Sequence, residues 1–174
     1  MEQTPLILTL SLDPAAQAYF NALRTLHFPP ERNYLHAHLT LFHHLTIPEK
    51  EIMETVREVC LSQKPFLLEV TGLLPLGRGV AFKLESETLL TFHAQLRQRW
   101  LPALTAQDQQ KLRPHVTVQN KVTPEAAKAL LHKLNGEFKP FTTKATGVML
   151  FKYLNGPWQF LQQFDFNQAE SLAS

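Results

Sequence analysis

The chain has 174 residues, 44% of them hydrophobic, and a formal net charge of +2. A chain of this size and composition can bury a proper core, which excludes a disordered protein, and the slight basic excess excludes a uniformly basic nucleic-acid binder. No apolar run approaches the roughly 18 residues that a membrane span needs. The opening Met1-Glu2-Gln3 resembles no signal segment, and Cys60 has no second cysteine to pair with, so we expect a cytoplasmic protein.

The predicted elements alternate between strands and helices, with clear helix starts at Asp13-Pro14, Ser86 and Thr123-Pro124. In the first half we expect a strand at 6–10, a helix from 13 to about 26, a strand at 34–42, a helix at 48–61 and a hairpin with strands at 65–74 and 79–84. In the second half we expect a helix at 86–101, a strand at 113–119, a helix from 123 to 135–136, a strand ending near 153, a hairpin turn at Asn155-Gly156 and a strand at 158–166.

The halves repeat one order of elements, and no linker rich in Gly, Ser or Pro divides them. We therefore predict a single domain over residues 1–174, with lobes that share one core and a polar tail from about 167 to 174. The predicted fold class is α+β. It is a bilobal, duplicated fold in which two antiparallel or mixed sheets face a central cleft, with the helices outside.

Two matched segments carry the chemistry: His38-Leu39-Thr40-Leu41 and His115-Val116-Thr117-Val118. On an extended strand, the histidine and the threonine of each segment share one face while the aliphatic residues share the other. The flanking residues extend the match. His36 and Phe42 are predicted on the polar face of the first segment, and Arg113 is predicted on that of the second, equivalent to His36.

Histidine pairs suit acid and base catalysis because imidazole can hold or release a proton near neutral pH. Threonine hydroxyls on the same faces can donate hydrogen bonds to negative charge that develops during the reaction. The catalytic candidates are therefore His38, His115, Thr40 and Thr117. The substrate-binding candidates are Arg113, as a charged supplement, and Phe42 and Tyr153, as rings that could stack on a base. Phe82 and Trp158 could stack in the same way, although core packing is the usual role of aromatic residues in strands.

These segments resemble the two motifs of the 2H phosphoesterase superfamily, which includes 2′-5′ RNA ligase type proteins and RNA 2′,3′-cyclic phosphodiesterases. The resemblance in element order covers residues 6–166. It implies a cleft without metal or other cofactor, in which the two histidines are general acid and base and the two threonines hold a phosphate. It also implies a terminal 2′-phosphate as the usual product, but it does not assign the acid and base roles or the natural substrate.

We accordingly expect a monomeric, metal-independent phosphodiesterase that acts on RNA ends or small cyclic nucleotides, with 2′-5′ joining as a possible reverse reaction and no membrane partner. Two alternatives stay open. One is a non-catalytic RNA-binding or nucleotide-binding module that keeps the cleft. The other is a metal hydrolase built on the histidine cluster His36, His38, His43 and His44, although no acidic residue or cysteine lies between Asn33 and Ile47.

Overall fold

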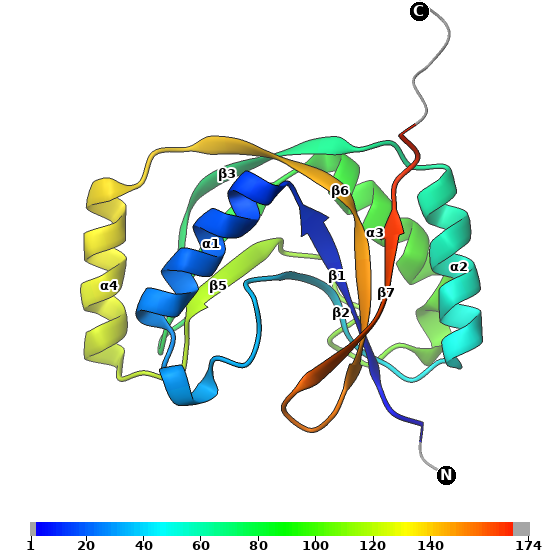
Figure 1. Cartoon of the computed structure of the whole chain (residues 1–174), viewed down its shortest axis with the longest axis horizontal. Helices are drawn as coiled ribbons and strands as arrows, with labels where there is room; N and C mark the ends of the chain where they lie inside the picture. Colours follow the sequence, from blue (N-terminus) through cyan, green and yellow to red (C-terminus); the bar gives the residue numbers. More distant parts are fainter. Residues whose placement is uncertain (1–2, 169–174) are drawn as a thin grey trace, which may run out of the picture.

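The computed structural model describes residues 3–168. Within them, four α-helices flank one antiparallel sheet of seven strands (Figure 1). The strands are β1 (Leu6–Leu12), β2 (Leu39–Leu45), β3 (Phe66–Pro75), β4 (Val80–Glu85), β5 (His115–Gln119), β6 (Phe141–Tyr153) and β7 (Trp158–Asp165). The helices are α1 (Pro14–His27), α2 (Glu49–Leu61), α3 (Glu87–Trp100) and α4 (Pro124–Glu137), with short 3-10 turns at Pro30–Arg32 and Leu101–Ala103. Most of the predicted tail, residues 169–174, lies outside the described residues.

The predicted helix starts are confirmed by their capping bonds. The side-chain oxygens of Asp13, Ser86 and Thr123 each accept a hydrogen bond from the backbone N–H three residues later, at 2.8, 3.1 and 3.2 Å. Such caps satisfy backbone donors that the first turn of a helix leaves without partners. None of the helices within residues 3–168 combines the length and apolar character that a membrane crossing needs.

The α+β class is confirmed, but the sheet is continuous, whereas the sequence suggested two separate sheets. The strand order is β2-β1-β6-β3-β4-β5, with β7 paired to β6. Strand β6 joins the halves because its first part, 141–145, pairs with β3 and its later part, 145–152, pairs with β1. Because this one long strand pairs with strands of both halves, the halves share a single sheet.

The curvature of the sheet brings its two outer strands, β2 and β5, beside each other (Figure 1). The helices support this closure across the halves. Helix α1 packs against β5, and Nε2 of His93 on α3 lies 3.1 Å from the carbonyl oxygen of Leu41 on β2. The buried apolar side chains of both halves form one hydrophobic cluster. The histidine-bearing strands are thus held together by helices from the opposite half.

Phe42 corrects one prediction. It was expected on the polar face with His38, but it is 0% exposed and packs in the core against His93 and Trp100. The pairing of Thr9 with Thr40 and of Leu8 with Phe42 leaves Leu41 as an extra residue in β2. A β-bulge of this kind turns the following side chain to the other face of the sheet. Phe42 therefore cannot stack on a substrate.

Candidate active site

The two outer strands present the four catalytic candidates on the face expected from the sequence. Thr40 on β2 and His115 and Thr117 on β5 are half-buried, and so is His38, which immediately precedes β2. The aliphatic residues between them point into the core, with Leu39 0% and Val116 1% exposed. The segment 34–38 is not part of a strand, so the first motif begins in a loop that enters β2.

Both histidines are oriented by the same local hydrogen bond. Nδ1 of His38 lies 2.8 Å from the carbonyl oxygen of His36, and Nδ1 of His115 lies 2.7 Å from that of Arg113. A carbonyl oxygen can only accept, so each Nδ1 carries a hydrogen and donates. In the neutral rings each Nε2 is then left as an acceptor, ready to take a proton. The accepting carbonyls belong to His36 and Arg113, the two positions that are equivalent when the two motifs are aligned.

His38 has the more perturbed environment. Burial is the main cause that lowers its pKa from 6.5 to about 4, and positive charge on Arg24, His43 and His115 lowers it further, against the opposing effect of the bond to His36. His115 is thus one of the charged groups that act on His38 electrostatically. At neutral pH the His38 ring is uncharged and can accept a proton.

Arg24 is a charged group of the site that the motifs did not reveal. It is 4% exposed, its Nε donates to Oδ1 of Asn33 at 2.8 Å, and its Nη1 donates to the carbonyl oxygen of Thr117 at 3.3 Å. Burial lowers its pKa to about 10, which still leaves it cationic at neutral pH. No carboxylate among residues 3–168 forms an ion pair with it. An uncompensated buried cation favours binding of an anion nearby.

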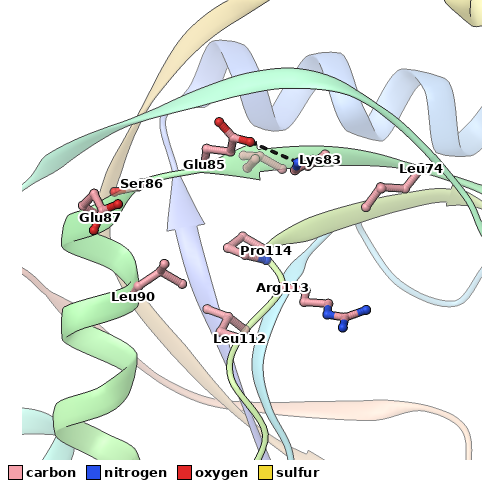
Figure 2. Close-up of a pocket in the computed structure, with 10 residues that line it drawn as sticks. Leu74, Lys83, Glu85, Ser86, Glu87, Leu90, Leu112, Arg113 and Pro114 are labelled. Atoms are coloured by element: carbon pink, nitrogen blue, oxygen red, sulfur yellow. Dashed lines mark ion pairs between the residues drawn. The ribbon is translucent and has the colours of Figure 1, made fainter.

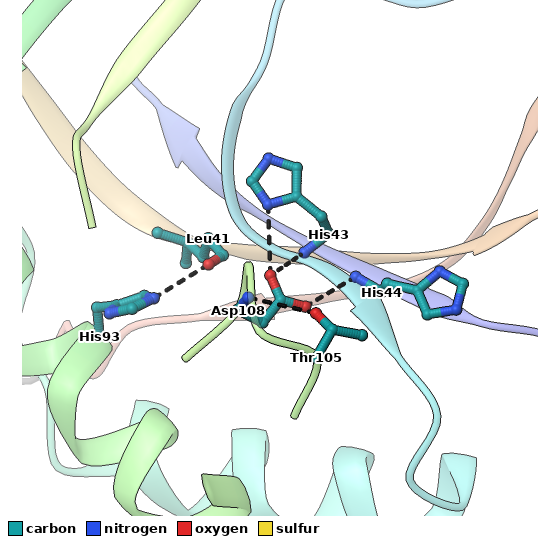
Figure 3. Close-up of polar contacts among 6 residues, drawn as sticks. All are labelled: Leu41, His43, His44, His93, Thr105 and Asp108. Atoms are coloured by element: carbon teal, nitrogen blue, oxygen red, sulfur yellow. Dashed lines mark hydrogen bonds and ion pairs between the residues drawn. The ribbon is translucent and has the colours of Figure 1, made fainter. Parts of the chain in front are cut away.

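Asp108, in the segment between α3 and β5, fixes the edge of β2 (Figure 3). Its two carboxylate oxygens accept the backbone N–H groups of His43 and His44 at 2.8 and 2.9 Å. Burial favours the neutral acid, but these bonds and that from the His43 ring keep the pKa of Asp108 below 3.8. Nothing in the sequence around Asp108 signals this role, because its partners lie on a distant strand.

A small cavity of about 140 Å³ lies between Thr40 and His115 and is bordered by His43, Lys111 and Arg113. Arg113 therefore borders the same cavity as Thr40 and His115. A second cavity, of about 770 Å³, lies against His36 and His38 and is bordered by Trp158. Tyr153 pairs with Trp158 in the β6–β7 hairpin but does not border this cavity. The hairpin ring nearest the histidine is therefore that of Trp158, 4.7 Å from the ring of His38.

A third cavity, of about 780 Å³, lies between β4, the start of α3 and the segment before β5 (Figure 2). Its polar side chains include the ion pair of Lys83 with Glu85 at 3.1 Å. Figure 2 shows the Arg113 side chain extending away from that pair. Neither motif histidine borders this cavity, so it offers no proton-transfer group of the kind that the two motifs supply.

The histidine cluster of the metal alternative is not assembled. Within residues 3–168, no three His, Cys, Asp or Glu side chains lie together in an arrangement that could hold a metal ion. His38 faces Trp158, whereas His43 lies 3.4 Å from Asp108. Cys60 is buried, and burial raises the pKa of its thiol to about 12, so it is not a nucleophile here.

Comparisons with known proteins bear on the family and the fold of the chain. A sequence model of the 2′-5′ RNA ligase superfamily matches residues 12–157. A search of curated protein sequences finds no match. Among solved structures, TT0787 of Thermus thermophilus has a TM-score of 0.66 at 18% identity, covering 95% of this chain and 100% of its own. E. coli LigT complexed with 3′-AMP has a TM-score of 0.59 at 18% identity, covering 96% and 100%. A structure described as a phosphoesterase has a TM-score of 0.61 at 18% identity, with the same coverage.

Proposed function

The chain belongs to the 2′-5′ RNA ligase superfamily, within the 2H phosphoesterases, and from this premise we propose that it is a metal-independent phosphodiesterase. Its substrates are 2′,3′-cyclic phosphates of nucleotides or RNA ends, or 2′-5′ linked nucleotides. His38 and His115 act as the acid and base pair. The observation that carries the proposal is the matched pair of Nδ1 bonds, which leave both Nε2 atoms available for proton transfer.

His38 is the base when a cyclic phosphate is opened. With a pKa of about 4 it is unprotonated in the empty enzyme at neutral pH. It takes a proton from water as the water oxygen bonds to phosphorus. The bond from phosphorus to one ribose oxygen breaks, and protonated His115 gives that oxygen its proton. The products are a phosphomonoester and a free ribose hydroxyl, and the two imidazoles have exchanged protonation states.

The remaining polar groups stabilise the charge on phosphate. Thr40 and Thr117 donate hydroxyl hydrogens to the non-bridging oxygens, on which negative charge accumulates in the transition state. The buried cation of Arg24, which donates to the carbonyl oxygen of Thr117, contributes positive potential. A bound phosphate also offsets the positive charges around His38, which raises the pKa of His38 and makes it a stronger base than in the empty site.

The proposal is tested by product analysis. The chelator-treated protein is incubated with the four nucleoside 2′,3′-cyclic phosphates, an RNA with a cyclic-phosphate end and 2′-5′ dinucleotides, and the products are identified by chromatography and mass spectrometry. We expect hydrolysis of at least one class. The matched control is the His38→Ala, His115→Ala double variant purified in the same way. No product from any substrate, or equal product from the double variant, would contradict the proposal.

A further inference from the structure

The cavity of about 770 Å³ beside His38 has a floor built by the sheet. In the register of β1, β6 and β7, Thr9 lies opposite Met149, which lies opposite Gln163, and Ser11 lies opposite Gly147, which lies opposite Asp165. Paired residues of neighbouring strands share a face. The floor therefore carries two rows of side chains, and Thr9, in the first row, also pairs with Thr40 of the first histidine motif.

Gly147 makes room for the polar end of this floor. A Cβ at position 147 would lie 2.9 Å from Nε2 of Gln163 and closer still to the backbone of β7. The absence of a side chain lets the Gln163 amide approach Ser11, whose Oγ lies 3.1 Å from Nε2 and 3.2 Å from Oε1. Nε2 also donates to Oδ1 of Asp165 at 3.2 Å. These contacts fix the orientation of the amide.

The groups on this part of the floor that can still form hydrogen bonds are mainly acceptors. Both hydrogens of the Gln163 amide have partners, whereas Oε1 keeps a free lone pair. The Asp165 carboxylate adds two acceptor oxygens, of which Oδ1 accepts the bond from Gln163. Deeper in the floor, the hydroxyl of Thr9 is buried and without a partner in that range. A ligand group that donates hydrogen bonds is complementary to this edge.

The wall of the cavity is aromatic. The ring of Trp158 lies 4.7 Å from that of His38 and 5.5 Å from that of Phe151. Phe160, whose ring lies 5.8 Å from that of Phe151, borders the same cavity and is 53% exposed. A large ring left open to solvent on a cavity wall is an available stacking surface.

We propose that this cavity, bordered by Phe151, Phe160, Gln163 and Asp165, binds the nucleobase of the substrate and prefers bases that carry an exocyclic amino group. This inference rests on the proposed function, since the scissile phosphate then lies at His38 and the base of the same nucleoside extends into the adjoining space. The volume falls within the range of about 300–1,000 Å³ that is usual for small-molecule sites. Adenine, guanine and cytosine present amino hydrogens to the acceptor-rich floor, whereas uracil presents carbonyl oxygens there.

The test compares substrates with and without a base. For the full-length protein, kcat/KM is measured with the four nucleoside 2′,3′-cyclic phosphates and with base-free methyl riboside 2′,3′-cyclic phosphate. Because every base can stack, we expect all four nucleosides to exceed the base-free compound by about 10-fold or more, and those with amino-bearing bases to exceed uridine by about a further 10-fold. Phe160→Ala should lower the ratio of nucleoside to base-free kcat/KM by about 10-fold because it removes a stacking surface.

Asp165→Asn replaces an acceptor with an amide that can donate, so it should lower the preference for amino-bearing bases over uridine by about 5-fold or more. Leu67→Ala, at a 63% exposed residue of β3 outside the cavity, is the matched control and should leave all ratios unchanged. The proposal is overturned if wild-type protein treats nucleoside and base-free substrates alike, if Phe160→Ala lowers both equally, or if Asp165→Asn leaves the preference among bases intact.

Calorimetry separates this inference from the proposed catalysis. If no cyclic phosphate is hydrolysed, the proposed function fails, but adenosine 3′-monophosphate should still bind at least about 10-fold more tightly than inorganic phosphate. Phe160→Ala should abolish that difference. Equal affinities of the wild-type protein for the two compounds would overturn the nucleobase site.

Discussion

His38 and His115 make the same hydrogen bond, each from Nδ1 to the carbonyl oxygen two residues earlier, at 2.8 and 2.7 Å. Each ring is therefore oriented by its own segment of backbone and not by the other ring. Removing one imidazole leaves the orientation of the other in place, so single substitutions report the loss of one proton-transfer group.

His38→Ala and His115→Ala should each lower kcat for a cyclic phosphate by about 10²–10⁴-fold, because each removes one acid or base function. The double variant should be far less impaired than the product of the two single effects, since both groups act in one displacement. Steady-state kinetics of the three variants provide the measurement. Near wild-type turnover by His115→Ala, with an inactive His38→Ala, would exclude the paired mechanism.

The acidic limb of the pH profile of kcat/KM should lie near pH 4, well below the ordinary histidine value of 6.5, because His38 must be unprotonated in the free enzyme. The limb should move to higher pH in Arg24→Gln, since removal of a nearby cation makes protonation of His38 easier. Rates measured from about pH 3.5 to 9, with circular dichroism at each pH to verify folding, test both statements. A wild-type limb near the ordinary histidine value that Arg24→Gln does not move would refute them.

Asp108→Asn should lower the free energy of unfolding by about 1–3 kcal/mol, because an amide NH₂ cannot accept both backbone N–H groups of β2. The pKa of Asp108 is lower in the folded protein than its usual 3.8, so its stabilisation is fully present above pH 3.8 and is lost as the pH falls through the folded value. The difference between wild type and variant should therefore shrink in acid. Urea unfolding at about pH 7 and about pH 3 measures it.

Glu58→Gln is the control for Asp108→Asn. It removes an exposed ion pair with Arg99 at 2.9 Å and should change the free energy of unfolding by no more than about 1 kcal/mol. Equal effects of the two substitutions would mean that the bonds of Asp108 to β2 contribute no more than a surface pair.

Excess EDTA should leave turnover unchanged, because the two imidazoles already supply both proton transfers. The substitution His44→Ala should also leave turnover unchanged, since the His44 ring is exposed and only its backbone is bound by Asp108. Activity measured before and after chelation, followed by addition of zinc or manganese, tests this. Loss on chelation and recovery with metal would favour the histidine-cluster alternative.

The sequence was sufficient for most of the element order because the signals were local. Asp13, Ser86 and Thr123 start helices through bonds to residues three positions away, which a short window contains. The matched motifs also predicted correctly that His115 and Thr117 share a half-buried face of β5. Their proposed catalytic roles remain predictions for the experiments above.

What the sequence concealed depends on distant contacts. Arg24 belongs to neither motif, and its importance emerges only when α1 meets β5. Asp108 has partners on a strand far earlier in the chain. Phe42 was assigned to the wrong face because strict alternation cannot anticipate the bulge at Leu41, which is visible only in the pairing of β1 with β2.

Strand β6 has a consequence for how relatives of this protein can diverge. Its residue Ala145 pairs with Leu12 of β1 on one side and with Phe66 of β3 on the other, and it is fully buried. An inserted residue there would invert the faces of one half relative to the other and turn one histidine away from its counterpart. The hairpin turn at Asn155-Gly156 is under no such constraint, since exposed tips accept changes in length. Evolution can therefore alter the reach of the aromatic wall without disturbing the spacing of the two imidazoles.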